Sequence, residues 1–134
     1  MLCDPDGLLG DFDSASPQAV DALVSLGAWI EHFPTQKDET DTQLAVERAI
    51  LMGATQVTLA GGMGGRLDHA LGNLQLLMHL EERGIPAMMV SGHCRAWAAC
   101  RCMAIPGKPG DLLSLIPFGT VLFGMFGILY SFSC

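Results

Sequence analysis

The chain has 134 residues, of which 50% are apolar and 16% are charged, a globular composition that argues against disorder and fits about one domain. Its net charge is −7 with only seven Lys and Arg, so the basic surface expected of a nucleic-acid-binding protein is missing. Five cysteines without a CxxC pair favour free thiols in a reducing cytoplasm.

The first part of the chain predicts a strand, a helix and a second strand. A short apolar run that ends at Gly10 is the first strand. Ser16 followed by Pro17 predicts the start of a helix, with the hydroxyl as N-cap, and Gly27 marks its end. Residues 28–33 then predict a strand.

The middle of the chain repeats this alternation. Thr40 or Asp41 is expected to cap a second helix that ends at Gly53, and residues 57–60 form the next strand. A third helix then runs to Arg83-Gly84, with apolar side chains recurring at helical spacing at Leu67, Leu71, Leu74 and Met78.

Residues 87–90 predict another strand directly after this helix. Strand, helix and strand in succession are typical of a parallel sheet, so the expected fold class is α/β with a parallel-sheet domain in residues 1–91. In such sheets, functional groups gather at the carboxyl ends of the strands.

Residues 92–134 differ from the preceding residues in composition and periodicity, which predicts a second unit. Helical periodicity disappears there, and residues 112–134 contain no charged residue, a length that would span a membrane. Pro117 and glycines at 119, 124 and 127 interrupt the stretch, so residues 112–118 are better interpreted as a buried strand. A zinc site built from the histidine and cysteines of residues 93–102 lacks the usual ligand spacing.

Two acidic segments follow the first two predicted strands. In GDFDS (residues 10–14), Asp11 and Asp13 offer hard oxygen ligands that suit Mg²⁺, although an ordinary turn before a helix has the same composition. In residues 33–41, three acidic residues surround Lys37 and Thr40. They form either a solvated loop or the rest of a metal site, with the lysine placed for a phosphate.

A glycine-rich segment, GGMGGRLDH (residues 61–69), leads into the strongest predicted helix. Glycines such as Gly62, Gly64 and Gly65 let backbone N–H groups approach an anion, and a helix N-terminus favours negative charge. Arg66 adds a fork of donors. The segment is neither a Walker loop nor a GxGxxG fingerprint.

In this order and spacing, the three segments resemble the catalytic domain of thiamine pyrophosphokinases. That family carries a GDxDS segment, a KDxTD-like segment and GGxGGRxDHxLGN leading into a helix, and here the last reads GGMGGRLDHALGN over residues 61–73. Residues 110–119 resemble an early strand of the family's C-terminal β-sandwich. The resemblance therefore covers residues 5–119 and implies a thiamine-binding sandwich that begins in residues 92–134.

The resemblance implies a cytoplasmic, homodimeric transferase that moves diphosphate from ATP to thiamine, giving thiamine diphosphate and AMP, with Mg²⁺ and without nucleic-acid or membrane partners. It places the metal on Asp11, Asp13 and Asp41. It places the nucleotide phosphates beside Lys37, Thr40, Arg66 and the loop glycines Gly62, Gly64 and Gly65. Asp38 and Asp68 match more weakly; Asp68 either orients Arg66 or contacts thiamine, and no general base is assigned.

Two departures from the family pattern temper this expectation. Family members have an acidic strand end before GDxDS and a longer sandwich with a late Ser-Asn pair, and neither is present in this sequence. We therefore expect a chain that corresponds to part of the enzyme, incomplete at both ends and of reduced activity. The alternatives are a non-catalytic Mg-nucleotide-binding fragment and a small protein anchored in a membrane by residues 112–134.

Overall fold

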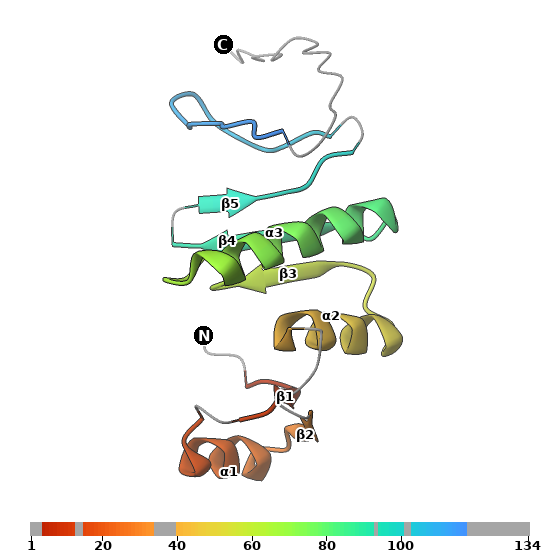
Figure 1. The fold of residues 1–134 in the computed structure, drawn as a ribbon, viewed down its shortest axis with the longest axis vertical. Coiled ribbons are helices and arrows are strands. Elements are labelled where there is room, and N and C mark those ends of the chain that lie inside the picture. Colours follow the sequence, from red (N-terminus) through yellow and green to blue (C-terminus); the bar gives the residue numbers. More distant parts are fainter. Residues whose placement is uncertain (1–3, 13–14, 34–39, 93, 101–102, 118–134) are drawn as a thin grey trace. The chain divides into compact units, whose positions relative to one another are not determined.

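The structure is a computed structural model that describes residues 4–12, 15–33, 40–92, 94–100 and 103–117. Helices and strands alternate along most of these residues (Figure 1). In chain order they are β1 (Gly7–Gly10), α1 (Pro17–Ser25), β2 (Trp29–His32), α2 (Asp41–Leu51), β3 (Val57–Ala60), α3 (Leu67–Glu82), β4 (Ala87–Ser91) and β5 (Cys94–Ala96).

The segment β1–α1–β2 is a βαβ unit. Its two strands are parallel, with Gly7 opposite Trp29 and Gly10 opposite His32. Ser16 caps α1, its Oγ accepting a hydrogen bond from the backbone N–H of Ala19 at 3.3 Å, as the sequence predicts. The Trp29 ring lies so close to Gly7 that a Cβ there would be 2.0 Å from its Cε2 atom, so this pairing requires glycine.

Helix α2 connects this unit to the next one. Thr40 is its N-cap, and its Oγ1 accepts from the backbone N–H of Gln43 at 3.2 Å. The helix contacts β1 and α3, so it lies against parts of both units. Arg48 forms a 3.0 Å ion pair with Glu31 of β2, and Glu47 forms another with Arg83.

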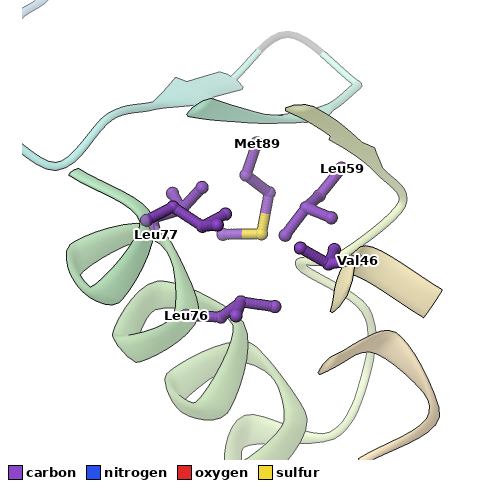
Figure 2. Packing of buried hydrophobic residues seen from close by; sticks show 6 residues of the cluster. Val46, Leu59, Leu76, Leu77 and Met89 are labelled. Atoms are coloured by element: carbon purple, nitrogen blue, oxygen red, sulfur yellow. The ribbon is translucent and has the colours of Figure 1, made fainter. Parts of the chain in front are cut away.

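The segment β3–α3–β4 is a second βαβ unit, extended by β5. The strands β3 and β4 are parallel, whereas β5 pairs antiparallel with β4. The core lies between α3, β3, β4 and α2, and Figure 2 shows the Met89 side chain pointing between Leu59 and Leu77. Its fully or nearly fully buried members are Val46, Leu59, Leu76, Leu77, Leu80 and Met89.

The side chains whose spacing predicts α3 are only partly the ones that the helix buries. The helix itself is confirmed, but Leu67 and Leu71 are 72% and 49% exposed. The buried residues of the helix are Asn73, Leu76, Leu77 and Leu80, and Leu74 packs against them as a partly buried residue. Two apolar rows satisfy the same helical period on this leucine-rich helix, and only the position of the sheet decides which row is covered.

The sequence predicts that a second unit begins at residue 92. Because β5 pairs with β4, the compact part of the chain that contains both βαβ units continues to Met103. A separate compact part begins at Ala104. Of the strand predicted over residues 112–118, the described part, up to Pro117, is exposed and forms no strand, so that prediction is wrong there. No helix in the described residues is long and apolar enough to cross a membrane. The β-sandwich assigned to residues 92–134 stays a prediction.

Candidate functional site

Asp11 and Phe12 directly follow β1 and are the described part of the first acidic segment, called the acidic turn below. Phe12 has φ +57°, a left-handed conformation that costs a non-glycine residue about 1–2 kcal/mol. Its ring packs edge-on against His32, at the end of β2, with 4.9 Å between ring centroids. This contact holds the turn that carries Asp11 at the carboxyl end of the two-stranded sheet.

The first turn of α2 brings a second carboxylate to the same place. Asp41 Oδ2 lies 3.3 Å from the position that a Cβ on Gly10 would occupy. Asp11 and Asp41, which stand thirty positions apart in the sequence, therefore both lie beside the end of β1. The other residues predicted for this side of the site, Asp13, Lys37 and Asp38, lie outside the described residues.

A pocket of about 480 Å³ opens at the carboxyl end of β3. The glycine-rich segment forms one wall through Gly61, Gly62, Gly64 and Gly65, and Arg66, the N-cap of α3, also lines the pocket. Thr42, in the first turn of α2, also faces this pocket. The start of α2 thus contributes Asp41 to the acidic turn and Thr42 to the glycine-lined pocket, which links the two predicted parts of the site.

The N-terminus of α3 differs from those of α1 and α2. Ser16 and Thr40 cap the first two helices with their hydroxyl groups, whereas Arg66 stands at the N-cap of α3 and makes no side-chain capping hydrogen bond. Arg66 and His69 of this helix start line the glycine-rich pocket, so the positive end of the helix dipole lies beside it.

Arg66 and Asp68 form a forked ion pair at this helix start. Arg66 Nε and Nη2 donate to Asp68 Oδ1 and Oδ2 at 3.2 and 2.5 Å. The hydrogen bond from Arg66 lowers the pKa of Asp68 from 3.8 to about 2, and the same bond raises the pKa of Arg66. The guanidinium has five N–H donors, so this pairing leaves some of them for an anion.

The glycine segment is anchored to the core by Asn73. This buried α3 residue donates from Nδ2 to the Gly62 carbonyl oxygen at 2.9 Å. Sequence reasoning did not assign a role to Asn73, nor to Thr42 and Thr58, which also line the pocket. The sequence contains one signal for the role of Asn73, because it stands in helical register with three leucines. A buried position of this kind favours an apolar residue unless the asparagine amide is hydrogen-bonded.

The donor set at the acidic turn fits magnesium. Mg²⁺ prefers oxygen ligands and is commonly held by one or two carboxylates together with substrate phosphates. Asp11 and Asp41 supply such carboxylates near one strand end. The part of the chain that the structure describes holds no group of three or more His, Cys, Asp or Glu arranged for a metal ion, so a phosphate or Asp13 would have to add ligands.

Comparison with known proteins identifies close similarity in sequence. The family model described as "Thiamin pyrophosphokinase, catalytic domain" matches residues 1–89. A thiamine pyrophosphokinase of Bacillus subtilis (strain 168) is 36% identical over 73 residues, covering 54% of this chain and 34% of the relative. Thiamine pyrophosphokinase 1 of Arabidopsis thaliana is 30% identical over 96 residues, covering 67% and 35%. The chain therefore spans about a third of the length of these curated relatives.

Solved structures show the same similarity in three dimensions. The crystal structure of thiamine pyrophosphokinase from Bacillus subtilis matches with a TM-score of 0.55 and 30% identity, covering 65% of this chain and 40% of that one. A thiamin pyrophosphokinase family protein from Enterococcus faecalis matches with a TM-score of 0.53 and 34% identity, covering 61% and 40%.

Proposed function

The chain belongs to the thiamin pyrophosphokinase family, and on that premise we propose that it binds Mg-ATP and carries out, or contributes to, diphosphate transfer from ATP to thiamine. The observation that carries this proposal is the N-terminus of α3, which has no N-cap side-chain bond and faces a glycine-lined pocket next to Arg66. Backbone N–H groups in this arrangement bind phosphate.

The proposed nucleotide site joins the pocket to the acidic turn. The polyphosphate would lie against Gly62, Gly64 and Gly65, with Arg66 and, from the second acidic segment, Lys37 and Thr40 approaching its oxygens. Thr40 already caps α2 through Oγ1, so its first role is to position the helix that carries Asp41. Asp11, Asp13 and Asp41 would hold Mg²⁺, which when bound neutralises charge on the phosphates.

In the proposed reaction, the thiamine hydroxyl oxygen forms a bond with the β-phosphorus of ATP. The bond from that phosphorus to the oxygen bridging the α- and β-phosphates breaks, AMP leaves and the hydroxyl proton is released. Such a transfer depends mainly on positioning and on charge stabilisation. Asp68 would orient Arg66, which its forked ion pair supports.

Three further features belong to this proposal. The active form would be a homodimer, the protein would work in the cytoplasm, and residues 92–134 would contribute to a thiamine-binding β-sandwich. Sedimentation at several concentrations tests the first, and fluorescent tagging tests the second. Thiamine binding that persists in a chain ending at residue 103, which keeps β5 and its pairing with β4, would count against the third.

Titration calorimetry of ATP with and without Mg²⁺ tests the site. We expect binding only with the cation, because a chain of net charge −7 repels a bare triphosphate. Asp11→Asn and Asp41→Asn should weaken binding about tenfold or more each, since charged hydrogen bonds and ion contacts contribute about 1.5–3 kcal/mol. Asp21→Asn on α1 is the matched control, because it changes net charge equally and lies outside the proposed site.

Release of AMP that depends on thiamine, with saturating Mg-ATP, tests the transfer itself. Turnover in the parent chain that Arg66→Gln removes would support an enzyme. Mg-dependent ATP binding without thiamine-dependent AMP would instead identify a nucleotide-binding protein that lacks transfer activity. Equal ATP affinity with and without Mg²⁺ would contradict the metal assignment.

A further inference from the structure

We propose that Asn73 is a positioning residue that holds the glycine-rich segment of residues 61–65 in the shape that receives phosphate. Its side chain is on the helix that this segment leads into, so the helix fixes the loop that precedes it. Asn73 is only 8% exposed and lies in helical register with Leu76, Leu77 and Leu80.

Packing alone does not account for an asparagine at this position. Burying an amide costs free energy unless it is hydrogen-bonded, and an apolar residue would suit the leucine row better. The amide is satisfied by a specific partner: Nδ2 donates to the Gly62 carbonyl oxygen at 2.9 Å. The hydrogen bond to the Gly62 carbonyl therefore explains why an asparagine stands among the buried leucines.

Met89 of β4 holds Gly62 as well. A Cβ on Gly62 would lie 2.5 Å from Met89 Sδ and 3.2 Å from Asn73 Nδ2. Met89 is 0% exposed and belongs to the core cluster, so any shift of its side chain would disturb the packing around it. The Gly62 backbone is thus held between a helix side chain and a strand side chain, and a side chain at this position would require Met89 to shift.

This arrangement fixes the direction of one peptide group in the loop. The Gly62 carbonyl points to Asn73, and in a trans peptide the following N–H, that of Met63, points the opposite way. The same Gly62 and Asn73 line the pocket at the start of α3. A loop held in one conformation loses less conformational freedom when a ligand binds, which raises affinity.

The decisive experiment measures the loop without ligand. In Asn73→Leu, backbone amide hydrogen exchange in residues 61–65 should become about tenfold faster, the scale of one lost hydrogen bond. Exchange in the α3 core around Leu77 should stay the same or slow down, because leucine suits the buried row. Gln75→Leu makes the same polar-to-leucine change at an exposed α3 position and should leave the loop unchanged.

Two further measurements keep the test decisive if Asn73→Leu fails to fold. Asn73→Asp retains the shape but replaces the donor with an acceptor, so it should loosen the loop similarly. In the parent protein, the Asn73 side-chain amide should show a proton protected from exchange. Unchanged loop exchange in a folded Asn73 variant, or an unprotected side-chain amide in the parent, would overturn the positioning role.

The consequence for ligand binding rests on the proposed function and is tested separately. With Mg-ATP as the probe, Asn73→Leu should raise Kd about tenfold while thermal stability is kept or increased. If the parent chain binds no Mg-ATP, the proposed function fails, and the ligand-free exchange still decides the role of Asn73. If Asn73→Leu speeds exchange in residues 61–65 but leaves the Kd for Mg-ATP unchanged, the predicted effect on binding is wrong. The contact between Asn73 and the loop is then still supported.

Discussion

The two βαβ units of this chain share a topology and differ in how much they bury. In β3–α3–β4, the helix contributes four buried residues, and the core closes over Leu80 and Met89, both 0% exposed. In β1–α1–β2, the helix buries none of its residues, and among the unit's described residues Ala28 is the buried apolar one. The same connectivity therefore gives one unit with a dense core and one without.

This difference separates the two sides of the proposed site. The glycine segment belongs to β3–α3–β4, the unit with the dense core, and contacts Asn73 and Met89 of that unit. The acidic turn depends on Phe12 against His32 and on the first turn of α2. Local stability follows buried apolar contact, so we expect the phosphate side to be the more rigid one in the free protein. Four predictions test this comparison.

The largest expected effect comes from a matched pair of leucine truncations. Leu80→Ala should lower the free energy of unfolding by about 2–5 kcal/mol, because it removes a fully buried side chain and leaves a cavity. Leu26→Ala, at the 65% exposed C-cap of α1, should cost less than about 1 kcal/mol. Urea unfolding measures both. Equal losses would show that the first unit has a core of its own.

A glycine pair gives the next largest effect. Gly62→Ala should cost about 1–3 kcal/mol, because its Cβ would collide with the buried Met89 side chain. Gly72→Ala on α3 meets no atom within 4 Å and should stabilise the chain by up to about 1 kcal/mol, since alanine favours helix. Thermal unfolding should therefore shift in opposite directions for the two variants. A shift in the same direction would contradict the close packing of Gly62.

An ion pair on α2 gives a smaller effect and probes how the first unit is attached. Arg48 and Glu31 lie 3.0 Å apart with side chains 45% and 34% exposed, whereas Val46 anchors the same helix in the core at 5%. Glu31→Gln should therefore cost about 0–1 kcal/mol and lose its effect in high salt. Val46→Ala should cost more at every ionic strength. A large, salt-independent loss in Glu31→Gln would show that polar contacts hold α2 in place.

The smallest effect on stability concerns Asp68, whose side chain is exposed. Its pKa falls to about 2 beside Arg66, below the ordinary value of 3.8. Because the folded-state pKa is the lower one, the pair stabilises the folded chain above about pH 4, and this stabilisation disappears as the pH falls through about 2. Carboxyl NMR titration of Asp68 in Arg66→Gln should return the midpoint to near 4. An unchanged midpoint would show that the pair does not persist in solution.

Several features of the site could be predicted from the sequence and others could not. The glycine segment before a helix and the carboxylates after strands indicate phosphate and metal chemistry, because backbone donors and hard oxygen ligands are local properties of a few residues. Asn73 was missed since its partner, the Gly62 carbonyl, is eleven positions away, and nothing in the local pattern predicts that contact. Thr42 was missed for a similar reason, because the packing of α2 decides which of its residues face the pocket.

By itself, the sequence determined where the helices and strands of the first ninety residues lie. The caps at Ser16 and Thr40 and the glycines after each helix act within a few residues, so their signals can be read directly along the chain. Only the tertiary structure decided that α3 buries Leu76, Leu77 and Leu80 while Leu67 stays exposed, and that β5 joins β4. Those outcomes depend on which surface the sheet presents to the helix and to the next strand, a property of packed elements that a helical or strand period does not contain.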